Sequence, residues 1–252
     1  PLKVHRFGLS IICQYCGATV RLSDKAISVK RFRKALKDWN TPENYGIISC
    51  LSLGNQCWVR SKEIAEGETS KVYTGMRARF PTELGIIKIL GNTDNAALFN
   101  NEWETIQKLH RSDAQGAEFF TRSFPQPIVH GEITSGDFKG QLVNIFRWRG
   151  GFHYNFEHVH QAYPQGIEPR ASIWIWRRIL ETLSFIHATG MVHGAVLPPH
   201  LLVQENDHGI FMVGYNRAGM RNEKLHSIPA GFEAFYTNNH LTPQIDLSRS
   251  AR

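Results

Sequence analysis

Short apolar runs separated by turn residues follow one another in the chain after residue 57. Trp58–Ala65, Ser70–Arg79 and Leu84–Leu90 are rich in valine, isoleucine and tyrosine, and glycine or proline interrupts them. Runs of β-branched and aromatic residues between turn signals are typical of strands. We therefore expect three consecutive strands here, and two more at Pro127–Ile133 and Gln141–Trp148.

A helical period replaces this pattern in two longer segments. Asp94–His110 is interpreted as a helix, because Leu98, Trp103, Ile106 and Leu109 recur at roughly helical spacing. Glu168–Thr189 gives the stronger signal, and Gly190 is placed to cap its C-terminal end. We expect this second segment to be a long buried helix, with a stripe made of Ile173, Trp176, Leu180, Leu183 and Ile186.

Two further patterns flank these elements. Leu201–Val203 and Ile210–Tyr215 are apolar runs joined by a turn-forming stretch, which predicts a small hairpin. Near the start of the chain, Arg21–Trp39 has apolar residues among basic ones, and Pro42 follows it. This spacing is compatible with an amphipathic helix whose polar face is cationic.

The composition is that of a globular protein, since 42% of the 252 residues are hydrophobic and 20% are charged. A chain of this length has room for one two-lobed domain, or for one domain and a small module. No apolar run approaches the roughly 18 residues of a membrane span, and no signal segment opens the chain. We therefore expect a cytoplasmic protein that does not engage a membrane.

The net charge of +7 is concentrated at one end of the chain. Residues 1–60 hold ten lysines and arginines against three acidic residues, whereas the remainder holds nineteen of each. Such an excess suits an acidic partner, either nucleic acid or an acidic protein face, and it also promotes solubility. Both interpretations stay open, because neither a nucleic-acid reader motif nor a pattern of stacking aromatics accompanies the basic residues.

The four cysteines raise the question of a zinc site. Cys13 and Cys16 form a C-x-x-C knuckle followed by glycine, and structural zinc takes four ligands. Cys50 and Cys57 would complete an all-cysteine set with irregular spacing, and His5 is another candidate ligand. The alternative is two buried or vestigial thiols, since a redox role lacks the βαβ context it needs.

These elements follow one another in the order found in protein kinases: three strands, a helix, two strands, a glycine pair and a helical half with a small hairpin. The chain from about residue 58 to 252 resembles the eukaryotic-type protein kinase family, most densely over Leu180–Val203. The resemblance implies an α+β, two-lobed fold, with a basic segment (1–57), a β-rich N-lobe (58–149) and a partial helical C-lobe (150–252). The family's last C-lobe helices are missing, so we expect a fragment of a longer protein.

The resemblance also implies a nucleotide site. The turn before Tyr73 is similar to the glycine-rich loop that covers phosphates, although only its middle glycine remains. Lys88 resembles the third-strand lysine and Glu102 its helix partner, whereas Glu104 faces elsewhere. A hinge before the glycine pair would offer backbone groups to adenine. The implied nucleotide-binding residues are Gly67, Ser70, Val72, Lys88, Glu102, Phe146 and Trp148.

Four positions depart from the family's catalytic pattern. Ala195 stands where the family has the aspartate of His-Arg-Asp, so a methyl group replaces the carboxylate that orients the acceptor hydroxyl. Leu197 replaces a phosphate-contacting lysine, and His200 replaces a metal-binding asparagine. The metal-binding aspartate of Asp-Phe-Gly corresponds to Gly214, or to Val213 if the alignment slips by one. Magnesium requires oxygen ligands that these positions do not supply.

These departures predict a pseudokinase, a catalytically impaired domain that binds, scaffolds or regulates a protein partner. One alternative is an atypical ATP-binding kinase or another nucleotide-using transferase, which the Lys88–Glu102 pair would serve. A second alternative is a nucleic-acid-binding protein that works through residues 1–60. The adenine slot is left open, either to ATP or to side chains that fill it. Asp246 resembles the residue that anchors the catalytic-loop backbone in this family.

Overall fold

The computed structural model describes residues 10–12, 19–21, 49–79, 82–204, 209–225, 227–236 and 242–250. The chain divides into two compact units, between Ile47 and Ile48. In the first unit, β1 (Ser10–Ile12) pairs antiparallel with β2 (Thr19–Arg21). Arg21 therefore belongs to a strand rather than to the predicted helix, and the rest of that helix lies outside the described residues.

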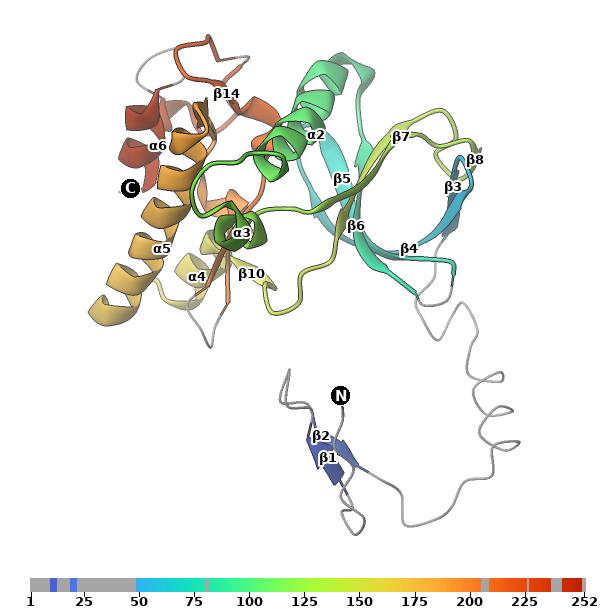
Figure 1. Ribbon diagram of the computed structural model, residues 1–252, viewed down its shortest axis with the longest axis horizontal. Helices are drawn as coiled ribbons and strands as arrows, with labels where there is room; N and C mark the ends of the chain where they lie inside the picture. The colour runs from blue at the N-terminus through green and yellow to red at the C-terminus, as the bar shows by residue number, and fades with distance from the viewer. Residues whose placement is uncertain are drawn as a thin grey trace. The chain divides into compact units, whose positions relative to one another are not determined.

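A seven-stranded antiparallel sheet with the order β7-β9-β6-β5-β4-β3-β8 forms the β-rich part of the second unit. β8 follows β7 almost directly in the chain but pairs with β3 at the opposite edge, so the sheet curls around its own interior (Figure 1). The five predicted strands are present, and β3 and β8 add to them. The strands are β3 (Ser49–Leu53), β4 (Gln56–Glu66), β5 (Ser70–Arg77), β6 (Leu84–Leu90), β7 (Pro127–Glu132), β8 (Ser135–Gly136) and β9 (Leu142–Arg147).

Alternation along the strands fills the interior of the curled sheet. Ile87 and Ile89 of β6 point inward and are buried, whereas Lys88 between them lies on the other face. Trp58 is fully buried in the same interior. It has room because Gly85 lacks a side chain: a Cβ at Gly85 would lie 2.9 Å from the Trp58 ring.

The helical part of the second unit begins after β9 and includes α5 (Pro169–Ala188), which lies along its outer edge, while α2 (Ala96–His110) lies between this part and the sheet (Figure 1). Both long helices were predicted. Glu168 caps the N-terminus of α5, and Gly190, at φ +79°, follows its C-terminus as expected. The remaining helical elements are η2 (Thr93–Asn95), α3 (Ala117–Phe120), η3 (Thr121–Ser123), α4 (Phe156–Ala162), η4 (Pro198–His200), η5 (Tyr215–Arg217), η6 (Glu233–Phe235) and α6 (Pro243–Ser250).

The predicted apolar stripe of α5 is correct only in its second half. Leu183 and Ile186 are buried, but Ile173 is 64% exposed and Trp176 is 46% exposed. Ile175, between those two, faces the core instead. The residues from 173 to 176 are all apolar, so the pattern does not show which of them turns inward.

Short strand pairs complete the helical part. β12 (Leu201–Val203) and β13 (Ile210–Met212) form the predicted hairpin, and β10 (Tyr154–Asn155) pairs with β12. β11 (Met191–Val192) pairs with β14 (Gly219–Met220). β13 ends earlier than predicted because the chain turns into η5 at Gly214. Within the described ranges, no helix has both the length and the apolar character needed to cross a membrane.

Candidate functional site

The predicted lysine–glutamate pair is present. Lys88 Nζ lies 2.5 Å from Glu102 Oε2, and these side chains are 16% and 2% exposed. Glu104 is exposed to solvent, so the choice between the two glutamates was correct. The pair ties α2 to β6. Because it is deeply buried, removing either partner would leave an uncompensated charge.

The loop corresponding to the glycine-rich loop is packed down onto the protein. Thr69 and Ser70 are 5% and 4% exposed, and the Gly67 amide donates within the loop to the Ser70 carbonyl at 2.9 Å. Asn95 Nδ2 donates to the Glu68 carbonyl at 3.1 Å. Val72 is half-buried and lies opposite Lys88 in the sheet register. One hydrogen bond within the loop and one from Asn95 therefore fix the loop, whose buried residues are Thr69 and Ser70.

A buried arginine at the end of η5 contacts this loop. Arg217, only 2% exposed, places its guanidinium 2.8 Å from Glu68 Oε2 and donates from Nε to the Ser227 carbonyl at 2.9 Å. Sequence reasoning did not single out either member of the Arg217–Glu68 pair. Nothing local in the sequence signals it, since the partners are 149 residues apart.

The catalytic-loop segment is anchored in the way that the resemblance implies. Asp246 of α6 is fully buried and accepts hydrogen bonds from the backbone amides of His193 and Gly194, at 2.9 and 3.0 Å. His187 Nε2 lies 2.8 Å from the same carboxylate. Tyr236 donates to the Gly194 carbonyl at 3.1 Å. These hydrogen bonds fix the backbone of the loop and do not depend on the side chains at positions 194 and 195.

Apolar side chains stand on that loop at the positions of the family's aspartate and lysine. Ala195 and Leu197 are buried apolar groups. His200 Nδ1 lies 2.8 Å from the Ala195 carbonyl, which can only accept, so this nitrogen carries the proton. Burial lowers the pKa of His200, and nearby Lys88 acts in the same direction. A neutral imidazole therefore occupies the asparagine position.

At the position that corresponds to the metal-binding aspartate, the ring of His200 occupies the space that a side chain would need. Gly214 has φ +79°, and a Cβ there would lie 2.6 Å from Cδ2 of the His200 ring. Tyr215 is fully buried, with its ring 4.4 Å from the His193 ring. Of the two alignments, the one that puts the aspartate at Gly214 is the one that puts the buried ring of Tyr215 at the phenylalanine position.

α2 holds the segment that follows. Asn101 Nδ2 donates to the carbonyls of Asn216 and Ala218 at 2.9 and 2.7 Å. The hydroxyl of Tyr215 is buried and has no hydrogen-bond partner among the described residues, and burial raises its pKa well above the ordinary value. This segment is packed tightly between α2 and the catalytic loop.

The predicted hinge residues are largely engaged by the protein itself. Phe146 is 3% exposed and belongs to the core, and its backbone is in register with Ile86 of β6. The Trp148 amide donates to the Leu84 carbonyl at 3.1 Å. Adenine recognition through the Trp148 amide would therefore require this hydrogen bond to break.

Two of the four cysteines can be placed. Cys50 and Cys57 are exposed on the neighbouring strands β3 and β4, and burial, followed by the nearby Cys50 thiol, raises the pKa of Cys57. Cys13, Cys16 and His5 lie outside the described residues. Among the residues that are described, no group of three or more candidate ligands is placed to hold a metal ion.

Comparison with known proteins supports the fold. No protein-family model matches the sequence, and neither does any curated protein. Among solved structures, the chain is similar to one titled "Crystal structure of BubR1 kinase domain", with a TM-score of 0.56 and 14% sequence identity. The match covers 88% of this chain and 70% of that one. The chain thus has a kinase-like fold, and at this identity the likeness extends to the fold alone.

Proposed function

We propose that this protein is a catalytically impaired kinase-like domain that acts by binding a protein partner. The observation that carries the proposal is the filling of the phosphate end of the cleft. His200 fills the space beside Gly214, and Ala195 is a buried methyl group. Phosphoryl transfer requires metal ions across the phosphates and a carboxylate at the acceptor hydroxyl. Neither group is present at these positions.

The Arg217–Glu68 pair supports the same proposal. It joins the loop above the cleft to the segment below it, with the arginine almost fully buried. Phosphates entering beneath the loop would have to displace Glu68 from Arg217 and lift the buried Thr69 and Ser70. A cleft held closed by its own side chains suits a rigid binding module better than an enzyme that must open and close each cycle.

Nucleotide titration tests the proposal directly. We expect ATP and ADP to leave the melting temperature unchanged, with or without magnesium, and we expect no phosphate transfer from labelled ATP to protein or peptide acceptors. The assay should use the longest natural chain, so that missing residues cannot explain inactivity. Magnesium-dependent transfer that Lys88→Ala abolishes, and that the exposed-surface control Lys62→Ala leaves intact, would overturn the proposal.

The second candidate is an atypical nucleotide-using enzyme, which the buried Lys88–Glu102 pair favours. In such an enzyme Arg217 would replace the metal ion as the positive charge on the phosphates. This candidate predicts magnesium-independent ATP binding that weakens on Arg217→Ala. Binding of this kind would replace the first proposal with the second.

Two expectations for the N-terminal segment stay predictions. Zinc held by Cys13, Cys16, Cys50 and Cys57 predicts about one zinc ion per chain, released by Cys13→Ser. Nucleic-acid binding through residues 1–60 predicts an affinity that falls steeply with salt. Metal analysis and a salt titration of RNA binding measure these two quantities.

A further inference from the structure

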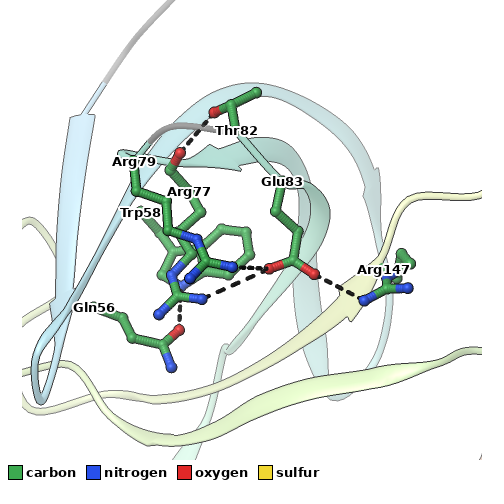
Figure 2. Close-up of polar contacts among 7 residues, drawn as sticks. All are labelled: Gln56, Trp58, Arg77, Arg79, Thr82, Glu83 and Arg147. Carbon is green, nitrogen blue, oxygen red and sulfur yellow. Dashed lines mark hydrogen bonds and ion pairs between the residues drawn. The ribbon is translucent and has the colours of Figure 1, made fainter.

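Three arginines converge on one carboxylate at the end of the sheet. Glu83 Oε1 lies 3.0 Å from a guanidinium nitrogen of Arg147. Glu83 Oε2 lies 3.8 Å from a guanidinium nitrogen of Arg77 and of Arg79. Figure 2 shows the three guanidinium groups, from the end of β5, the following turn and the end of β9, directed toward the Glu83 carboxylate. A single negative charge thus holds three positive charges in place.

Two more arginines extend this group. Arg122 and Arg149 line a small hollow of about 50 Å³ together with Arg147, Gln126 and Trp148. Both are exposed, and neither has an ion-pair partner among the residues that the structure describes. Together they form what we call the arginine patch, which consists of Arg77, Arg79, Arg122, Arg147 and Arg149.

The arginine patch carries more positive than negative charge, and some of its side chains are ordered before a ligand binds. Three of its five arginines pair with Glu83, and Arg122 and Arg149 have no ion-pair partner among the described residues, so the five positive charges exceed the single negative charge of Glu83 by four. A phosphate monoester brings about two negative charges and three acceptor oxygens, and guanidinium groups bind it with paired hydrogen bonds. Since Glu83 already orients three of the arginines, less side-chain entropy is lost when a ligand binds.

We propose that the arginine patch binds a phosphorylated segment of a partner protein. The inference rests on the proposed binding role and names the partner's chemistry. Its site borders the predicted hinge at Trp148 and shares no residue with the phosphate end of the candidate nucleotide site. Arg122, Arg147 and Arg149 line one hollow, and this arrangement fits a single phosphate group, as in other arginine-cluster recognition of phosphorylated peptides. Single-stranded nucleic acid would instead favour a groove with a row of exposed stacking aromatics, whereas the aromatics that border this hollow are Trp148 and Phe211, and Phe211 is only 7% exposed.

The test is fluorescence anisotropy with a degenerate phosphoserine peptide pool and its unphosphorylated counterpart. Arg122→Ala and Arg149→Ala are the decisive variants, because neither arginine forms an ion pair with any described residue, so its removal breaks no such pair there. We expect each variant to weaken binding about ten-fold, the loss typical of one charge-assisted hydrogen bond. Arg170→Ala, which removes an exposed arginine of α5 elsewhere on the unit, should leave the affinity unchanged.

Equal binding of the two peptide pools, or equal affinity of the wild-type protein and the two variants, would overturn the proposal. Arginine-patch-dependent binding of single-stranded RNA or of anionic vesicles in preference to the phosphorylated pool would also overturn it. This failure is distinguishable from a failure of the proposed function. Phosphate transfer in the nucleotide assay would refute catalytic impairment whether or not the peptide binds, and absence of peptide binding leaves the filled cleft as it is.

Discussion

Two sets of positions around the candidate site differ in charge: those that support the fold, and those where protein kinases carry catalytic groups. Where a charged group supports the fold, it is present and paired, as with Lys88 and Glu102 or with Asp246 beneath the catalytic loop. Where the group would serve only a bound metal or substrate, it is replaced, as at Ala195 and Gly214. Burying a charge is costly unless partners compensate it. The comparison teaches that architectural and catalytic charges are separable in this fold.

We do not expect a single substitution to restore catalytic chemistry. Ala195→Asp would place a carboxylate at a fully buried position, and a buried charge is costly unless partners compensate it. Catalytic groups of this kind act as a unit, so one restored member recovers little. The predictions below test each side of the comparison, from the largest expected effect to the smallest.

Asp246→Ala should have the largest effect, because it leaves two buried backbone amides and His187 without their acceptor. We expect the free energy of unfolding to fall by about 3–5 kcal/mol, measured by urea denaturation. Asp137→Ala is the matched control, since that carboxylate is 62% exposed and pairs only at 4.0 Å. Similar losses in the two variants would break the comparison.

Gly214→Ala should be next. It incurs about 1–2 kcal/mol for a left-handed backbone with a side chain, and in addition a contact of 2.6 Å with the His200 ring. Gly140→Ala isolates the backbone part, because Gly140 has φ +88° and nothing within 4 Å of an added Cβ. Thermal denaturation should show the larger loss for Gly214→Ala, and His200→Ala in the same chain should remove the difference. Equal losses without that second change would show that His200 does not fill this space.

Glu68→Gln should loosen the loop with only a modest loss of stability. Removing the charge leaves Arg217 with one backbone acceptor, so we expect local opening to become easier by about 1 kcal/mol. Hydrogen exchange of residues 67–70 measures it. Glu66→Gln, whose partner Lys71 is largely solvent-exposed, should leave exchange nearly unchanged. Unaltered exchange in both variants would mean that the Arg217–Glu68 pair does not hold the loop.

Tyr215→Phe should have the smallest effect, and in the opposite direction. The buried Tyr215 hydroxyl lacks a partner among the described residues, so its removal should stabilise the protein by about 0.5–1 kcal/mol. Tyr154→Phe, at a 48% exposed ring, should change little. A destabilised Tyr215→Phe variant would indicate that the hydroxyl is hydrogen-bonded in solution.

Much of the fold and part of the site followed from local sequence patterns. The two-residue period of β6 puts Lys88 on the face opposite Ile87 and Ile89, and helical spacing puts Glu102 on the face of α2 toward it. The departures from the family's catalytic pattern were equally readable, because each is a matter of residue identity at one position. The identities of Ala195 and Leu197 are read from the sequence, whereas their burial depends on the rest of the chain.

What the sequence by itself determined is therefore the type and order of the elements and the chemistry missing from the catalytic positions. Only the tertiary structure decided that β8 closes the curled sheet against β3, which face of α5 is buried between residues 173 and 176, and that Arg217 is paired with Glu68. The physical reason is the range of the interactions. Hydrophobic periodicity acts over a few residues, whereas strand closure, the choice among adjacent apolar side chains and a buried ion pair depend on partners that distant parts of the chain supply.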